Sequence, residues 1–213
     1  MGFYSRVLFP RLVNFVMSGA ELAGLRKTLL ADAAGEVLEI GFGSGLNLPY
    51  YPDRVINLTT IDANPGMNTL AQKRIAASPI QVNQHLLHAE SLPFPNASFD
   101  TVVSTWTLCS IADLDQALRE IYRVLKPAGR FLFLEHGLSE ELAVQKWQHR
   151  LTPLNKKVAD GCHLDRDIAA RILRNRFKIV DLHRFSLKKA PRIVGSMYRG
   201  VAVKAEIVQA RLF

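Results

Sequence analysis

From residue 36 onward, short apolar runs alternate along the chain with segments of helical periodicity. Seven of the runs have the length and composition of β-strands. Repeated strand and helix units predict an α/β fold with a mostly parallel seven-stranded sheet and helices on both faces. The predicted strands are VLEI (37–40), LTTI (58–61), QVNQHLL (81–87), DTVVS (100–104), RFLFLE (130–135), FKIVDLHRF (177–185) and YRGVAVKA (198–205).

Start and stop signals place helices between these runs. Asp113 and Gln116 have the spacing of a capping pair, so we expect a helix from Asp113 to the turn KPAG (126–129). Asn64-Pro65 marks another helix start, because proline is favoured at the first helical position. The last two strands follow the helical segment 165–177 and are expected to pair as a hairpin, which adds an antiparallel edge to the sheet.

Two segments lie outside this alternation. GFYSRVLFPRLVNFVM (2–17) is apolar with interspersed arginines, and Pro10 is expected to interrupt a helix there. EELAVQKWQHRLTPLNKKVADGC (140–162) follows the fifth strand. Either segment could cover a pocket, and ordinary packing on the sheet explains most of their residues. No run has the length of a membrane-spanning helix.

Composition is compatible with one well-buried domain of 213 residues, since 48% of the chain is hydrophobic. The net charge of +8 is uneven: residues 1–35 carry +2, residues 36–137 carry −3 and residues 138–213 carry +9. Such a basic surface could meet nucleic acid, anionic lipid or an acidic substrate, and a solvated face without a partner explains it equally well. Cys109 and Cys162 lie far apart in the sequence, which predicts free thiols of a cytoplasmic protein and no metal site.

The stretch LEIGFGSGLNLPYYP (38–52) places Gly41, Gly43 and Gly45 directly after the first predicted strand. A phosphate-binding P-loop would carry Lys followed by Ser or Thr where this chain has Leu46-Asn47. A dinucleotide fingerprint needs a third Gly or Ala, and neither register of the motif supplies one. The sequence therefore disfavours both a nucleoside triphosphate and a dinucleotide.

Two acidic residues flank the glycines: Glu39 precedes them and Asp62 ends the next strand. Asp62 can accept hydrogen bonds from both hydroxyls of a ribose, and Glu39 can help to hold an ammonium group. The glycines allow the backbone to approach a ligand closely. S-adenosylmethionine has a ribose and an ammonium group but no phosphate, so it fits this pattern, although glycine turns followed by an aspartate occur in many α/β proteins.

Later segments support the same ligand. HAESLPFPNASFDTVVS (88–104) puts Ala89, Glu90 and Ser91 in the loop after the third strand, where an adenine ring would lie, and STWTLCS (104–110) leaves the fourth strand toward the same side. With these motifs the chain resembles class I S-adenosylmethionine-dependent methyltransferases of the type 11 group, which includes quinone C-methyltransferases and bacterial phosphatidylethanolamine N-methyltransferases. The resemblance covers residues 36–137 and implies a Rossmann-like fold.

A narrower resemblance extends to the end of the chain. TLCSIADLDQALREIYRVLKPAGRFLFLEHG (107–137), DGCHLDR (160–166) and YRGVAVK (198–204) are similar to the methyltransferase-like alkyl thiol S-methyltransferases, membrane-associated enzymes that methylate hydrogen sulfide and small thiols. Two departures stand out. The hydrophobic N-terminal anchor of the animal members is replaced by a shorter segment with arginines. His88 stands where many type 11 enzymes have an aspartate that contacts adenine, which leaves this role to Glu90 or to backbone groups.

The resemblance implies how one domain, 1–213, is divided: an N-terminal helical segment or lid (1–35), a cofactor-binding core (36–137), and acceptor-side helices with the last two strands (138–213). It implies S-adenosylmethionine as the methyl donor and S-adenosylhomocysteine as the product. The residues that it implies for the cofactor are Glu39, Gly41, Gly43, Gly45, Asn47, Asp62, Ala63, Asn64, Met67, Ala89, Glu90, Ser91, Thr105 and Trp106.

Methyl transfer from a sulfonium is an in-line displacement with a neutral leaving group, so positioning is the main demand on the protein. A thiolate acceptor loses its charge as the new bond forms, which an apolar pocket favours. His136, at the end of the fifth strand, is the candidate for a base or an orienting residue, and a local hydrogen bond before Gly137 is the alternative. His163, beside Cys162, is a second candidate.

These features predict an enzyme that methylates a small molecule, a thiol or hydrogen sulfide first, with phosphatidylethanolamine N-methylation or quinone C-methylation as alternatives. Nucleic acid is not expected as a partner, because TWTLCS (105–110) stands where amino-directed base methyltransferases carry Asp/Asn-Pro-Pro-aromatic. Binding of S-adenosylmethionine without catalysis stays open, and no feature reveals the oligomeric state. Arg6 and Arg11 could touch an anionic leaflet; we expect no stable attachment and a cytoplasmic protein, at most peripheral at the inner membrane surface.

Overall fold

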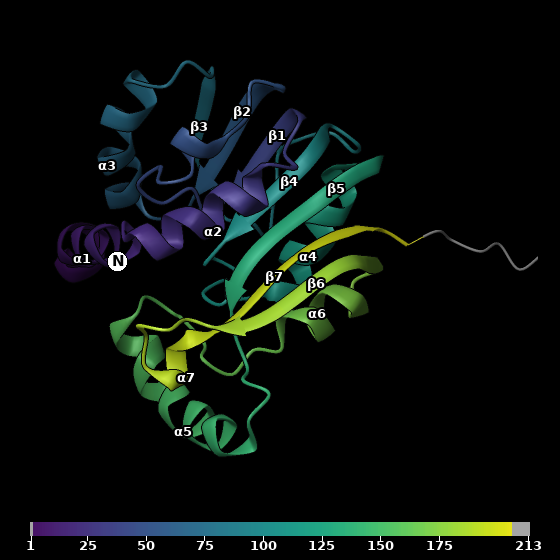
Figure 1. Cartoon of the computed structure of the whole chain (residues 1–213). Helices are drawn as coiled ribbons and strands as arrows, with labels where there is room; N and C mark the ends of the chain where they lie inside the picture. Colours follow the sequence, from purple (N-terminus) through teal and green to yellow (C-terminus); the bar gives the residue numbers. More distant parts are fainter. Residues whose placement is uncertain (1, 206–213) are drawn as a thin grey trace, which may run out of the picture.

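The computed structural model describes residues 2–205, and seven strands form one sheet in the order β3-β2-β1-β4-β5-β7-β6 (Figure 1). β7 runs antiparallel to both β5 and β6, and the other neighbours are parallel. The predicted antiparallel edge is therefore confirmed. The strands are β1 Gly35–Ile40, β2 Val55–Asp62, β3 Val82–Leu86, β4 Phe99–Thr105, β5 Leu125–His136, β6 Phe177–Ser186 and β7 Ser196–Lys204.

Helices cover the sheet on both faces, and α5 and α7 lie beyond the carboxyl end of β5 (Figure 1). No helix within residues 2–205 is both long and apolar enough to cross a lipid bilayer. Residues 206–213, the end of the predicted acceptor-side segment, lie outside the described part of the chain. The helices are η1 Tyr4–Leu8, α1 Phe9–Met17, α2 Ala20–Leu30, η2 Leu48–Tyr50, α3 Pro65–Ala76, α4 Leu114–Val124, α5 Leu142–Val158, α6 Ile168–Arg174 and α7 Arg192–Gly195.

Alternate residues of the central strands enter two different cores. On β5, Phe131 and Phe133 pack in the cluster that also contains residues of α4 and α6. Leu132 and Leu134 pack on the other face, with residues of α2 and α3. Successive side chains of a strand point to opposite faces, so a strand buried on both faces needs the uninterrupted apolar run that the sequence shows.

Two helices begin at the predicted caps. The Asn64 side chain accepts a hydrogen bond from the backbone N–H of Gly66 at 2.9 Å, and the Asp113 side chain accepts one from Gln116 at 2.9 Å. The reciprocal half of the capping pair is absent, because the Asp113 N–H donates to Glu90 Oε1 at 3.3 Å and the Gln116 side-chain oxygen accepts from Arg119. Capping by Asp113 therefore holds without the full capping box.

The predicted turn at KPAG is wrong. Residues 126–129 belong to β5, where the pairing with β4 jumps from Phe99–Leu125 to Thr101–Arg130. Several residues of β5 thus stand opposite one residue of β4, Asp100, as an irregular bulge. Lys126 Nζ lies 2.8 Å from both carboxylate oxygens of Asp100, and this ion pair compensates for the lost ladder bonds.

Pro10 does not interrupt the N-terminal helix as expected. The π-helical turn η1 leads directly into α1, and Pro10 falls in the first turn of α1. An N–H in the first turn of a helix has no partner within that helix, so a proline there removes little. The segment lies against α3: Asn64 Nδ2 donates to the Ser5 carbonyl at 2.8 Å, and an added Cβ on Gly66 would overlap the carbonyl oxygen of Arg6.

A buried carboxylate ties β5 to the turn after β4. Glu135 is fully buried; its Oε1 accepts from the Ser104 hydroxyl at 2.7 Å, and its Oε2 accepts from the N–H groups of Thr107 at 2.9 Å and Leu108 at 3.1 Å. Burial, with the neighbouring charge of Cys109 as a lesser cause, raises the pKa of Glu135 to about 8. The folded state therefore keeps a proton that the unfolded chain loses.

We predict that Gly66→Ala loosens the N-terminal segment without unfolding the protein. Alanine favours the helix α3, but its methyl group displaces the carbonyl of Arg6. Trypsin cleavage after Arg6 or Arg11 should accelerate several-fold, while Tm changes little. Gly24→Ala in α2 is the matched control, because nothing lies within 4 Å of an added Cβ there. Equal cleavage rates in the two variants would contradict this packing.

We also predict that the stability of the protein falls as pH rises from 4.5 to about 8. Glu135 has a pKa of about 8 when folded and an ordinary pKa of 4.5, so the folded state holds the extra proton in this window. Glu135→Gln keeps an acceptor for the turn and removes the titration. Its free energy of unfolding, measured with urea, should fall less steeply with pH than that of the wild type.

The remaining slope in that variant comes from the other groups whose pKa the folded state raises: Glu39, which burial raises to about 7, together with Asp62 and His136. The exposed Asp53 serves as the control, and Asp53→Asn should follow the wild-type slope. If Glu135→Gln also follows the wild-type slope, the carboxyl is ionised in the folded protein and the assignment fails.

Candidate active site

A cavity of about 480 Å³ opens at the carboxyl ends of the parallel strands. Its walls include Gly41 after β1, Asp62 at the end of β2, Thr105 at the end of β4 and His136 at the end of β5. β1 and β4 are neighbours in the sheet, and the order of the parallel strands reverses between them. Open α/β sheets bind their ligands at this kind of reversal.

Most of the site residues expected from the sequence line this one cavity. Glu39, Gly45 and Ser91 are not among the lining residues. The expected residues that do line it are Gly41, Gly43, Asn47, Asp62, Ala63, Asn64, Met67, Ala89, Glu90, Thr105, Trp106 and His136.

The glycine turn has the left-handed conformation that only glycine adopts freely: φ is +71° at Gly41 and +59° at Gly43. An added Cβ on Gly41 would overlap the side chain of Thr107, whereas nothing lies within 4 Å of an added Cβ on Gly43. Position 41 therefore requires glycine because the backbone packs closely against Thr107. Gly43 leaves its backbone bare toward the cavity, and its N–H donates to Asp62 Oδ2 at 2.8 Å.

Asp62 is held by backbone groups on both sides. Its Oδ1 accepts from the Asn64 N–H at 2.8 Å, and its Oδ2 accepts from the Gly43 N–H at 2.8 Å. Burial raises the pKa of Asp62, which these two hydrogen bonds oppose. Each carboxylate oxygen retains a second lone pair, so the fixed side chain can still accept hydrogen bonds from a ligand in the cavity.

Glu39 stands behind the cavity wall. It is buried, with Oε1 2.8 Å from Asn47 Nδ2 and Oε2 2.7 Å from the hydroxyl of Tyr51. Asn47, which lines the cavity, also donates to Thr105 Oγ1 at 3.0 Å, and its Oδ1 is buried without a hydrogen-bond partner among the described residues. Glu39 therefore orients Asn47, and the unpartnered amide oxygen belongs to the lining side chain.

Arg26 of α2 is a site residue that sequence reasoning missed. It is buried and lines the cavity; one guanidinium nitrogen donates to the Met17 carbonyl at 2.8 Å, and the group lies 4.7 Å from the ring centre of Trp106. Burial lowers its pKa to about 10, so it stays charged at neutral pH. Its Nε has no partner among the described residues. A lone arginine in a short amphipathic segment usually reaches solvent, which is why the sequence carried no clear signal.

The N-terminal segment covers the cavity. Phe9, Val13 and Met17 of α1 contribute apolar side chains to its wall. Two long-range bonds fasten the segment to the end of α5: the Tyr4 hydroxyl donates to the Val158 carbonyl at 2.7 Å, and the Ser5 hydroxyl donates to Asp160 at 2.8 Å. The cavity wall thus combines the N-terminal segment with the residues that follow α5.

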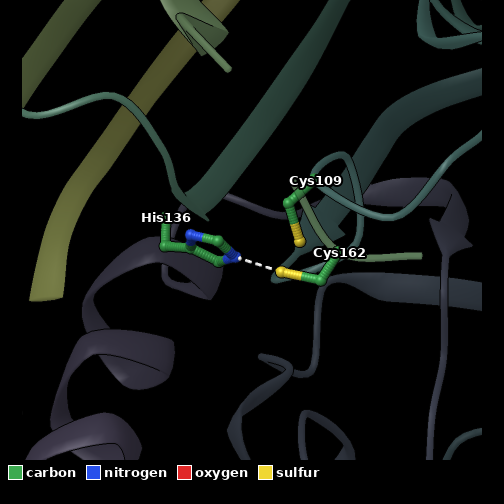
Figure 2. A group of neighbouring side chains, drawn as sticks. All are labelled: Cys109, His136 and Cys162. Carbon is green, nitrogen blue, oxygen red and sulfur yellow. Dashed lines mark hydrogen bonds between the residues drawn. The ribbon is translucent and has the colours of Figure 1, made fainter. Parts of the chain in front are cut away.

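Cys109, His136 and Cys162 meet at the same cavity (Figure 2). Cys109 follows β4, His136 ends β5 and Cys162 follows α5. His136 Nε2 lies 3.0 Å from Cys162 Sγ, and the two sulfurs and the ring nitrogen lie within 4.8 Å of one another. Both cysteines are free thiols, as expected, and folding brings them together although they lie far apart in the sequence.

The three groups share protons. The hydrogen bond with Cys162 and the neighbouring charge of His136 lower the pKa of Cys109 well below its ordinary value, against the effect of burial. The same hydrogen bond and burial raise the pKa of Cys162. Burial disfavours a charged imidazole, but Cys109 outweighs it and raises the pKa of His136. The shifts at Cys109 and His136 both favour the charged forms of these two groups.

Comparisons with known proteins agree with the methyltransferase resemblance of the sequence. The methyltransferase domain family matches residues 38–133. Thiol S-methyltransferase TMT1A of Homo sapiens is 33% identical over 206 residues, which cover 91% of this chain and 84% of that protein. Thiol S-methyltransferase TMT1B of Rattus norvegicus is 35% identical over 156 residues, 68% of this chain and 61% of that protein. Demethylmenaquinone methyltransferase of Symbiobacterium thermophilum is 34% identical, with 62% of this chain and 59% of that protein covered.

Solved structures support the fold. An S-adenosylmethionine-dependent methyltransferase from Aquifex aeolicus superimposes with a TM-score of 0.64 over 91% of this chain and 97% of that one, at 15% identity. The family domain lies on the strands whose ends form the cavity, and the similarity to TMT1A extends over nearly the whole chain. The chain therefore belongs to the S-adenosylmethionine-dependent methyltransferases, in the family that includes the thiol S-methyltransferases.

Proposed function

We propose that this protein transfers the methyl group of S-adenosylmethionine to the sulfur of a small thiol or of hydrogen sulfide. The observation that carries the proposal is the cavity itself. One wall consists of the glycine turn and Asp62, and another consists of the sulfur-rich cluster at His136. The thiol S-methyltransferases among its relatives support the same acceptor class.

The first wall fits S-adenosylmethionine by its donors and acceptors. We assign the ribose hydroxyls to Asp62 and the adenine to the loop that includes His88, Ala89 and Glu90. The side chains of Asn47 and Arg26 both line the cavity. We assign the Asn47 side chain to the ammonium group and the Arg26 guanidinium to the carboxylate at the same end of the ligand.

At the other wall we place the acceptor sulfur beside His136, the residue we assign to the acceptor. The acceptor enters as a thiolate; its lone pair forms the bond to the methyl carbon while the bond from that carbon to the sulfonium sulfur breaks. The electron pair stays on the departing sulfur, so S-adenosylhomocysteine leaves as a neutral thioether. The methylated acceptor is also neutral: a thioether from an alkyl thiol, or methanethiol from hydrogen sulfide. Phe9, Val13 and Trp106 surround this reaction with apolar surface, which favours the less charged transition state.

In this assignment residues 1–35 act as the lid, 36–137 hold the cofactor and 138–213 carry the acceptor side, within one domain. We place the enzyme in the cytoplasm, where Cys109 and Cys162 stay reduced. We expect at most a weak peripheral membrane contact, which the exposed Leu12 and Phe15 of α1 would make.

The proposal predicts that thiols head an acceptor panel with labelled S-adenosylmethionine. Hydrogen sulfide and alkyl thiols should be methylated, and a demethylated quinone, phosphatidylethanolamine vesicles and mixed oligonucleotides should yield at most traces. Quinone methylation is the second candidate, supported by the demethylmenaquinone methyltransferase among the relatives. The protein should stay in the supernatant when the vesicles are pelleted. If the quinone is methylated in preference to every thiol, the proposed thiol acceptor is wrong and a quinone takes its place.

We predict that Asp62→Ala weakens the binding of S-adenosylhomocysteine by roughly 100-fold, which corresponds to the loss of about two charge-assisted hydrogen bonds. Asp62→Asn keeps one acceptor oxygen, so its affinity for S-adenosylhomocysteine should lie between that of Asp62→Ala and that of the wild type. Asp53→Ala is the control, because Asp53 is exposed. Calorimetry measures the affinities. Far-UV circular dichroism checks that losing the hydrogen bond between Asp62 and the glycine turn has not unfolded the protein. Unchanged affinity in Asp62→Ala would remove the ribose assignment.

A further inference from the structure

The cluster of Cys109, His136 and Cys162 offers the ligand atoms of a metal site. Two sulfurs and one imidazole nitrogen point toward one another from three separate elements (Figure 2). Within residues 2–205 no other group of three or more His, Cys, Asp or Glu side chains converges in this way. Nε2 of His136 lies 3.0 Å from Cys162 Sγ, so it is the ring nitrogen that faces the sulfurs.

Two thiolates and one imidazole are a ligand set typical of zinc. Catalytic zinc sites use three protein ligands and leave the fourth tetrahedral position open, and Cys₂His is one of their sets. With zinc–sulfur bonds of about 2.3 Å and zinc–nitrogen bonds of about 2.0 Å, tetrahedral ligand atoms lie roughly 3.5 Å apart. The separations in the cluster, from 3.0 Å between His136 and Cys162 up to the limit of 4.8 Å, bracket that value.

The loops that carry the two cysteines are tied to each other and to the sheet. The His163 N–H donates to the Cys109 carbonyl at 2.9 Å, and Asn155 Nδ2 donates to the Cys162 carbonyl at 2.9 Å. Glu135 holds the turn before Cys109 through two backbone N–H groups. Contacts of this kind keep ligands in place before a metal binds, which reduces the conformational cost of binding.

We propose that Cys109, His136 and Cys162 bind one zinc ion and that the acceptor thiol, as assigned under the proposed function on which this inference rests, occupies the fourth position. All three residues line the cavity, so that position faces the bound S-adenosylmethionine. Two cysteine thiolates balance the charge of Zn²⁺. A third thiolate gives the centre one negative charge, which attracts the positive sulfonium across the cavity.

The reaction then balances without a further base. The acceptor thiol releases its proton to solvent when its sulfur binds zinc, as thiols do on metal coordination. The sulfur lone pair forms the bond to the methyl carbon, and the sulfonium bond to that carbon breaks. From an alkyl thiol the product is a neutral thioether, a weak ligand for zinc, and it leaves the fourth position to the next thiol. From hydrogen sulfide the product is methanethiol, which leaves as the neutral thiol with its remaining S–H proton in place. His136 thereby acts as a ligand and not as a proton acceptor.

Metal analysis of the purified protein tests the site directly. The protein is loaded with zinc under reducing conditions, desalted and assayed for metal. We expect about one zinc per chain in the wild type, and at least tenfold less in Cys109→Ser and in Cys162→Ser. His183→Ala is the matched control, because His183 is exposed on β6 and should leave the zinc content unchanged. A wild type without stoichiometric zinc, or serine variants that retain it, overturns the proposal.

Cobalt replaces zinc for a test of the fourth position. The Co²⁺ protein should show thiolate-to-cobalt charge-transfer absorption and the visible bands of a tetrahedral centre. Addition of hydrogen sulfide or an alkyl thiol, without S-adenosylmethionine, should strengthen the charge-transfer band. If added thiols leave the spectrum unchanged, the acceptor thiol does not bind the metal and the proposed fourth ligand is wrong. Metal bands that are lost in Cys109→Ser and in Cys162→Ser, but kept in His183→Ala, support the assigned ligands.

Activity separates this inference from the function on which it rests. If chelated, metal-free protein methylates thiols at the full rate, the thiol function stands and the zinc proposal fails. If the protein binds zinc and thiols but transfers methyl groups only to other acceptors, the zinc site stands and the proposed acceptor fails. Loss of thiol methylation on chelation, restored by zinc, supports both.

Discussion

Parallel pairing of β1, β2, β4 and β5 is the constraint on which the rest of the structure depends. Because these strands run in one direction, their carboxyl ends meet at one edge, and whatever residues follow them are brought together. The glycine turn and Asp62 supply the hydrogen-bonding part of the cavity, and His136 supplies the reactive part. Burial of the sheet on both faces makes this edge rigid, which suits a reaction that depends on alignment.

The polar groups around the cavity are positioned by partners behind its wall. Glu39 orients Asn47, backbone N–H groups fix Asp62, and Glu135 fixes the turn that leads to Cys109. Buried carboxyl groups of this kind cost free energy unless their oxygens are hydrogen-bonded, and here each oxygen is. The result is a cavity whose polar groups are fixed before a ligand arrives, so little reorganisation accompanies binding.

The two ends of the cavity differ in chemistry, and that difference organises the proposed reaction. Polar and charged groups near Asn47 and Arg26 suit an amino-acid end, while sulfur and imidazole at the opposite wall suit a soft acceptor or a soft metal ion. The N-terminal segment closes the space between them with apolar side chains. A sulfonium and a thiolate would then meet where water is scarce and their attraction is strong.

The sequence by itself determined the strands, the caps at Asn64 and Asp113, and most of the expected site residues that line the cavity, because each depends on local periodicity or on residues that follow a strand end directly. It misjudged KPAG, whose residues extend β5 without partners on β4, and Pro10, where a π-helical turn leads directly into the helix. Only the tertiary structure decided that Arg26 enters the cavity and that Cys109 meets Cys162. Such contacts join loops and helices distant in the chain, and no local pattern records which distant surfaces will pack together.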